Sequence, residues 1–99
     1  MNILNKNLQS IQKRAAPVLE RNDVEFAGIF GSYARGEERE TSDIDFLVRF
    51  RKPKSLFDLA GIELELSEAL KTKVDLVTEK ALCRHIKDRV MLDLQPIYG

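Results

Sequence analysis

Residues 30–48 read FGSYARGEERETSDIDFLV, so a glycine and a serine follow one apolar segment and two aspartates open the next. Side chains two residues apart in a strand point to the same face, so Asp43 and Asp45 project together while Ile44 points away. Two adjacent carboxylates repel unless a cation offsets them, and Mg²⁺ commonly binds carboxylates together with substrate phosphates. The pair therefore predicts a divalent-metal site at the start of a strand.

The glycine ahead of this pair predicts a turn that binds phosphate. Gly31 ends an apolar segment, and without a Cβ it lets backbone N–H groups approach a phosphate closely. Ser32 adds a hydroxyl donor, and a short helix beginning there would direct free N–H groups at the same anion. Arg35 could steady a triphosphate, although an ion pair with Glu37 or Glu38 is an equally good interpretation.

A third isolated acid lies in the segment KVDLVT, residues 73–78. Alternation along a strand places Val74 and Leu76 in the core and Asp75 on the opposite face, which we expect to be the face of the metal pair. An acid in that position can bind a metal and accept the proton of an attacking hydroxyl.

Helical and extended patterns alternate along the rest of the chain. Apolar residues recur at helical spacing from Leu4 to Leu19, and Pro17 is expected to kink or end this helix near Ala16. The other expected elements are strands at 24–30, 44–50 and 73–78, a short helix at 32–38, a helix capped by Ser55 and Asp58, a last helical stretch from Glu79 and a small edge strand at 97–98. We predict one α/β domain over residues 1–99, with a small mixed sheet of three to four strands packed with helices.

The composition limits the environment and the partners. Lys and Arg total 16, as do Asp and Glu, so the net charge of zero gives no general attraction to nucleic acid or to a membrane. A single cysteine, Cys83, and the lack of a signal-peptide or membrane-spanning pattern lead us to expect a cytoplasmic protein. A basic cluster of Arg49, Arg51, Lys52 and Lys54 follows the second strand, and it is either a solvated loop or a contact for a partner or nucleic acid.

Other nucleotide and metal motifs fail at particular residues. Gly31 and Gly36 have the spacing of a P-loop, but Glu37 stands where that loop needs lysine. A calcium loop beginning at Asp43 is excluded because Leu47 occupies a ligand position and no central glycine follows. A Rossmann fingerprint is absent.

The combination of motifs resembles a known superfamily. The string GSYARGE at 31–37, the string SDID at 42–45 and the later isolated Asp75 resemble the DNA-polymerase-β-like nucleotidyltransferases, and in particular their smallest branch, the minimal nucleotidyltransferases. The resemblance extends over residues 24–98. Each motif alone is weak evidence, but the set is specific.

The resemblance implies roles for individual residues. Asp43, Asp45 and Asp75 would be the catalytic, metal-binding acids. Gly31 and Ser32 would bind phosphate, and beyond the resemblance we expect Arg35 and Ser42 also to contact the nucleotide. The expected cofactor is Mg²⁺, as two ions, and the expected nucleotide substrate is ATP, attacked at its α-phosphorus with loss of pyrophosphate.

The resemblance also implies a partner. Minimal nucleotidyltransferases are commonly encoded beside a HEPN-domain ribonuclease as a toxin–antitoxin pair, so the expected acceptor is a hydroxyl, and in particular a tyrosine, of such a toxin. Two alternatives stay open. One is a non-catalytic antitoxin that neutralises its toxin by steric contact, against which the intact acids argue. The other is a small-molecule nucleotidyltransferase that works as a homodimer.

Overall fold

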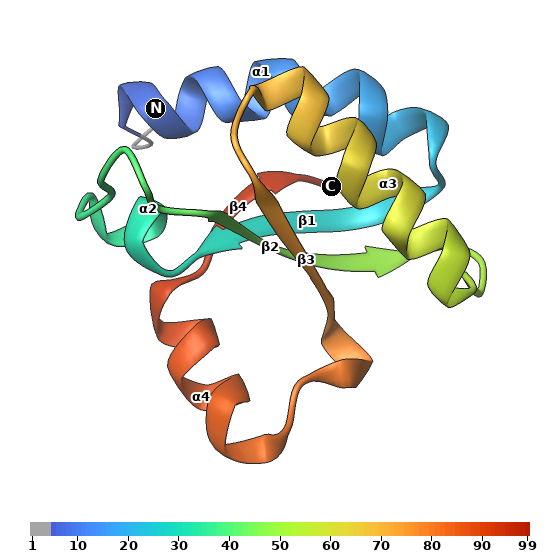
Figure 1. Ribbon diagram of the computed structural model, residues 1–99. Helices are drawn as coiled ribbons and strands as arrows, with labels where there is room; N and C mark the ends of the chain where they lie inside the picture. Colours follow the sequence, from blue (N-terminus) through green and yellow to red (C-terminus); the bar gives the residue numbers. More distant parts are fainter. Residues whose placement is uncertain (1–4) are drawn as a thin grey trace.

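The computed structural model describes residues 5–99, and it confirms the α/β class: a four-stranded mixed sheet is packed with helices (Figure 1). In chain order the elements are α1 (Lys6–Arg21), β1 (Val24–Phe30), α2 (Ser32–Arg35), β2 (Ile44–Phe50), α3 (Leu56–Leu70), β3 (Val74–Thr78), the 3₁₀ helix η1 (Glu79–Ala81), α4 (Arg84–Asp93) and β4 (Gln95–Tyr98). Strands β1 and β2 have the bounds that the sequence predicts. Within the described residues, no helix is both long enough and apolar enough to cross a membrane.

The sheet has the strand order β3-β2-β1-β4. Strand β1 runs antiparallel to both β2 and β4, whereas β2 and β3 are parallel. In this register Asp45 of β2 lies opposite Asp75 of β3 on one side and opposite Phe30 of β1 on the other. The last residues of β1 and the first residues of β3, which carry or adjoin the predicted site residues, therefore meet at the start of β2.

Helices cover the two faces of the sheet unequally. Helices α1 and α3 lie side by side over one face, and α4 lies beneath the other, where it packs against β1 (Figure 1). The core side chains Ile44, Phe46 and Val48 of β2 and Val74 of β3 belong to the cluster that α1 and α3 bury. Because side chains alternate along a strand, Asp45 points to the opposite face, which we call the underside.

Helix α1 continues through Pro17, so the predicted kink or end near Ala16 is wrong. Proline removes one N–H from the helical ladder. The two residues beyond it, Val18 and Leu19, are only 3% and 0% exposed, and their burial outweighs the lost hydrogen bond. Leu4, which we expected on the apolar face of this helix, lies outside the described residues.

Helix α3 begins at the predicted cap. The Asp58 backbone N–H donates to Ser55 Oγ at 3.1 Å, and the Ser55 N–H donates to Asp58 Oδ2 at 3.0 Å. Further along the helix, Glu63 Oε2 accepts from the backbone N–H of Leu76 at 2.9 Å. Glu63 therefore ties α3 to β3.

The segment after β3 differs from the prediction of one helical stretch from Glu79. A short η1 is separated from α4 by Leu82 and Cys83, both with extended backbone. The extended residues redirect the chain from the end of β3 back beneath β1. The predicted edge strand is confirmed as β4, which includes Pro96, and at an edge a missing N–H costs little.

Candidate functional site

Three acidic side chains share the underside of the sheet at the start of β2. Asp45 and Asp75 are direct neighbours on the parallel strands β2 and β3, and Asp43 precedes Asp45 by two residues. All three side chains are partly exposed. The expectation that Asp75 emerges on the same face as Asp45 is therefore confirmed, and Val74 is fully buried on the other face, as predicted.

Asp45 is the most perturbed group of this cluster. Burial, followed by the charges of Asp75 and Asp43, raises the pKa of the Asp45 carboxyl to about 6, although the nearby Arg35 guanidinium opposes the shift. No described residue donates a hydrogen bond to Asp45 or Asp75 or forms an ion pair with either. An ionised Asp45 therefore lacks a compensating partner, which is the arrangement a bound cation would relieve.

The acidic side chains are not arranged as a complete set of metal ligands in this structure. Over residues 5–99, no group of three or more His, Cys, Asp or Glu side chains is arranged to hold a metal ion. The Asp43 carboxylate instead lies 3.8 Å from Lys73 Nζ, in an exposed ion pair. Because such a pair contributes little free energy, Asp43 can exchange the ammonium for a metal at small cost. The donors fit Mg²⁺ chemically, since they are carboxylates on an open face that leaves room for phosphate oxygens and water.

The raised pKa of Asp45 predicts a pH-dependent stability. The folded protein binds the Asp45 proton more tightly than the unfolded chain does, because the pKa is about 6 in the fold and 3.8 in the free residue. The resulting contribution to the free energy of unfolding is therefore fully present below pH 3.8 and is lost as the pH rises through about 6. An Asp45→Asn variant cannot ionise. In EDTA it should melt at the same temperature as the unchanged protein near pH 4 and at a higher temperature above pH 6.5. We expect a difference of about 1 kcal/mol after discounting for solvent screening, or roughly 4–8 °C. A difference that does not vary with pH would contradict the assignment.

Gly31 has a second role that its sequence context does not reveal. Its backbone angles are φ 75° and ψ −151°, a combination that L side chains rarely adopt. A Cβ built at Gly31 would also collide with Asp45 Oδ2. The glycine therefore makes room for the Asp45 carboxylate as well as for the predicted phosphate.

Gly36 supplies a matched control for this role. It too has a positive φ, of 72°, but a Cβ there meets nothing within 4 Å. Gly36→Ala should therefore cost only the strain of a left-handed helical backbone, about 1 kcal/mol, whereas Gly31→Ala should cost about 1–3 kcal/mol more, because its φ and ψ lie in a region that only glycine readily adopts and because Asp45 must also move. Chemical denaturation measures both free energies of unfolding, and equal losses would exclude the contact with Asp45.

The remaining predicted residues have specific local partners. Ser32 begins α2 and is partly exposed beside Gly31. Ser42 closes the turn before β2, because its Oγ accepts from the Arg39 backbone N–H at 2.8 Å and its own N–H donates to the Arg39 carbonyl at 2.9 Å. Ser42 therefore helps to place the aspartate that follows it.

Arg35 forms two ion pairs. Its Nε lies 2.9 Å from Glu37, and its Nη1 lies 2.7 Å from Asp93 at the end of α4. Of the two expected acidic partners, Glu37 is confirmed, whereas Glu38 instead accepts from Asn7 at 3.3 Å. Asp93 was not predicted, because only the tertiary fold brings α4 beneath α2. Arg35 remains partly exposed, and its charge opposes the rise in the pKa of Asp45.

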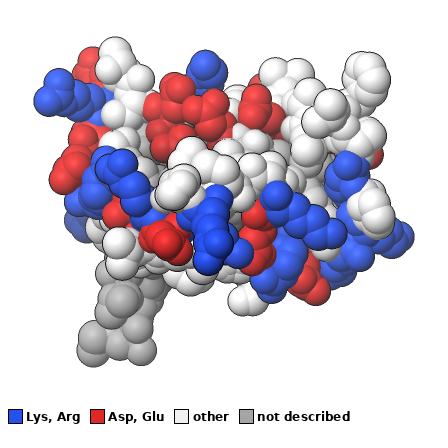
Figure 2. All heavy atoms as spheres, turned by 90° about the horizontal axis from the view of Figure 1, so that it is seen from below, with Lys and Arg blue, Asp and Glu red and all other residues white. Residues whose placement is uncertain are grey.

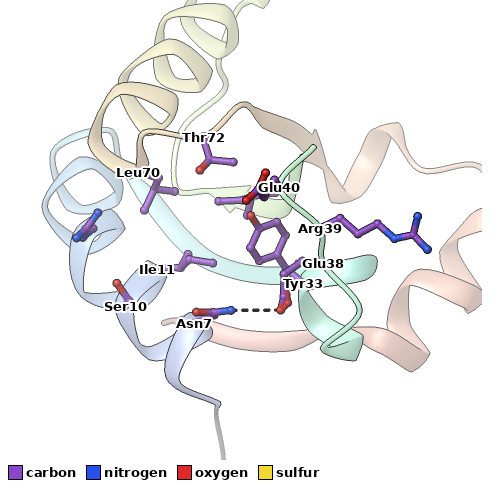
Figure 3. Close-up of a pocket in the computed structure, with 11 residues that line it drawn as sticks. Asn7, Ser10, Ile11, Tyr33, Glu38, Arg39, Glu40, Leu70 and Thr72 are labelled. Carbon is purple, nitrogen blue, oxygen red and sulfur yellow. Dashed lines mark hydrogen bonds between the residues drawn. The ribbon is translucent and has the colours of Figure 1, made fainter. Parts of the chain in front are cut away.

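Two hollows lie elsewhere on the surface, and neither is lined by the three aspartates. One, of about 490 Å³, lies between α1 and the loop before β2, where Tyr33 and Ile11 line it and Asn7 donates to Glu38 (Figure 3). The other, of about 730 Å³, lies at the far end of β2. The aspartates instead lie on an open part of the sheet.

Sequence comparison places the chain among nucleotidyltransferases. The family described as nucleotidyltransferase domain matches residues 11–96. A candidate protein adenylyltransferase of Methanocaldococcus jannaschii is 45% identical over 85 residues, which are 86% of this chain and 91% of the relative. The protein adenylyltransferase MntA of Thermococcus cleftensis is 40% identical over 75 residues, 76% of each chain.

Solved structures share the fold. A candidate minimal nucleotidyltransferase superposes with a TM-score of 0.77 and 35% identity, over 90% of this chain and 94% of the other. A structure of a tri-AMPylated Shewanella oneidensis HEPN toxin in complex with MNT antitoxin gives a TM-score of 0.74 at 21% identity, over 93% of this chain and 72% of the other. At that identity the second likeness shows the fold alone.

Proposed function

The chain belongs to the nucleotidyltransferase domain family, within the minimal nucleotidyltransferases, and is a nucleotidyltransferase; from this premise we propose that it transfers AMP from ATP and Mg²⁺ to a hydroxyl of a HEPN-type ribonuclease toxin. We further propose that the acceptor is a tyrosine and that the transfer makes this protein the antitoxin of that toxin. The observation that carries the proposal is the register of β2 and β3, which puts Asp45 and Asp75 side by side, with the Asp45 carboxylate next to Gly31.

The proposed reaction is a displacement at the α-phosphorus of ATP. The acceptor oxygen forms a bond to that phosphorus, the bond from the phosphorus to the bridging oxygen breaks, and pyrophosphate leaves. Mg²⁺ held by Asp43, Asp45 and Asp75 would neutralise the triphosphate and ease ionisation of the acceptor hydroxyl.

The chain's own residues position the reactants and receive the proton. Gly31 and Ser32 offer backbone N–H groups and a hydroxyl to the phosphates, and Ser42 holds the turn that places Asp43. Asp75 accepts the proton of the acceptor hydroxyl. Arg35 can contact the triphosphate from the underside if it gives up its ion pair with Glu37 or with Asp93. Exposed ion pairs of this kind contribute little free energy, so the exchange costs little.

A protein acceptor accounts for the openness of the site. Pockets that bind small molecules usually bury most of the ligand, whereas the three aspartates lie outside both hollows. The surface of a protein acceptor would complete the site and exclude water from it. The name of the Thermococcus relative, protein adenylyltransferase, and the AMPylated HEPN toxin bound to the MNT antitoxin support the same choice.

The position of a radiolabel tests the proposed reaction. The protein is incubated with Mg²⁺, a co-encoded HEPN-like protein, and ATP labelled at either the α- or the γ-phosphate. We expect the α-label to remain with the partner after denaturing electrophoresis and the γ-label to be released as pyrophosphate. Transfer of the γ-label would show phosphorylation instead. Labelling of a small molecule with no labelled protein would favour the small-molecule enzyme.

A further inference from the structure

The hollow at the far end of β2, here called the basic hollow, is lined by cationic side chains from three separate segments. Arg51 and Lys52 come from the loop between β2 and α3, Lys80 from η1 and Lys87 from α4. In Figure 2, which shows the underside, several Lys and Arg side chains lie at the right, the end to which β2 points in Figure 1, and others lie at the left, with Asp and Glu among both groups. The tertiary fold has therefore concentrated positive charge in a chain whose net charge is zero.

The cations of the basic hollow differ in whether they have partners. Two others that line it are paired: Arg49 with Glu25 and Glu79, and Lys54 with Asp23 at 3.0 Å. Arg51, Lys52, Lys80 and Lys87 form no ion pair with any described residue. Like charges gathered around one hollow repel each other, so an anionic ligand is the occupant that this site favours.

Apolar surface adjoins the basic hollow. Phe50, Pro53 and Leu59 contribute to its lining. Between the lining residues Pro53 and Leu59 the chain also carries Leu56 and Phe57, which are 83% and 91% exposed. Exposed side chains of this size are unfavourable in water and typical of the centre of a protein interface.

The basic hollow and Asp45 lie along one strand, β2. Arg49 is four residues beyond Asp45 in β2 and shares its face, which corresponds to about 13 Å along an extended chain. A macromolecule bound in the hollow can therefore also cover the acids at the start of the strand.

We propose that the basic hollow and the adjacent Leu56 and Phe57 bind an acidic, partly apolar surface of the protein that receives AMP. This inference rests on the proposed function in that it takes the acceptor to be a protein. A protein surface suits the exposed aliphatic and aromatic pair better than nucleic acid does, and the zero net charge gives no general attraction to a polyanion. In a symmetric dimer of this chain the two hollows would face each other and repel.

Charge reversal tests the basic hollow. The variant with Lys52→Glu and Lys87→Glu is compared with a matched variant, Lys6→Glu and Lys13→Glu, which makes the same charge change on exposed positions of α1. Both carry Asp45→Asn, so that binding to the co-encoded HEPN-like protein is measured without transfer. At low salt we expect the first variant to associate at least tenfold more slowly, with a weaker salt dependence, and the matched variant to change less than twofold.

Three results distinguish a failure of the docking inference from a failure of the proposed AMP transfer. Equal association rates for the two variants would overturn the inference, while AMP transfer by the unchanged protein could still stand. Binding of a single-stranded RNA oligonucleotide that is lost only in the hollow variant, with partner binding unaffected, would also overturn it in favour of nucleic acid. Slower association of the hollow variant, together with no detectable AMP transfer by the unchanged protein, would support the hollow and contradict the proposed function. If the melting temperature of the hollow variant does not fall, misfolding cannot explain its slower association.

Discussion

Replacing Asp45 with Asn should reduce AMP transfer by about 10³-fold or more while leaving the fold at least as stable. The activity falls because an amide cannot offset a metal's charge, and a metal contributes several kcal/mol to a phosphoryl-type transition state. The fold does not suffer because the carboxylate is half-buried, has no hydrogen-bond partner among the described residues, and is repelled by Asp75 and Asp43. Pyrophosphate release measures the activity, and thermal melting in EDTA measures the stability.

Asp88→Asn is the control for this change. Asp88 is exposed on α4 and has no partner among the described residues, so the same loss of one negative charge should leave activity and melting temperature nearly unchanged. If Asp45→Asn released pyrophosphate at the normal rate, Asp45 would have no role at the metal. If it melted at a much lower temperature, Asp45 would be a structural residue.

Asp75→Asn should reduce transfer by about 10²–10⁴-fold through loss of the proton acceptor, with a smaller effect on nucleotide binding. Asp75 is adjacent to Asp45 in the register of β2 and β3, so its carboxylate can reach an oxygen bound at the same site. Because Asp43 and Asp45 remain, we expect the affinity for ATP and Mg²⁺ in calorimetry to fall less than tenfold.

Asp75 is proposed both to bind the metal and to accept the proton of the acceptor hydroxyl. The dependence of transfer activity on pH distinguishes these two roles. If it accepts the proton, the residual activity of the Asn variant should rise with pH, because a more basic medium ionises more of the acceptor hydroxyl. A profile parallel to that of the unchanged protein, together with a large loss of ATP affinity, would mean that Asp75 acts only as a metal ligand.

Much of the site was predictable because it depends on local patterns. Alternation in Val74–Leu76 is enough to put Asp75 on the face opposite the core, and the apolar segments around it predict the strands. The cap at Ser55 was predictable for the same reason, since it involves residues three apart.

Other features depend on the tertiary fold and were missed. Helix α1 runs through Pro17 because burial of the residues beyond it outweighs a local preference. The close approach of Asp45 to Gly31 brings β2 against the turn that follows β1, and the pair of Arg35 with Asp93 joins segments 58 residues apart. Neither has a sequence spacing that could reveal it. The sequence predicts the basic cluster after β2, but it does not predict that Lys80 of η1 and Lys87 of α4 line the same hollow.

Intact-mass spectrometry of the co-encoded HEPN-like protein tests the central proposal most directly. The partner is incubated with ATP, Mg²⁺ and either the unchanged protein or the Asp75→Asn variant, and its ribonuclease activity is followed in parallel. We expect the unchanged protein to add one or more adenylyl groups to a partner tyrosine as the ribonuclease activity disappears, and the variant to add them at least about 10²-fold more slowly. A partner that stays unmodified yet is fully inhibited, by the Asp43→Asn variant as well as by the unchanged protein, would contradict AMP transfer as the basis of neutralisation and establish steric contact in its place.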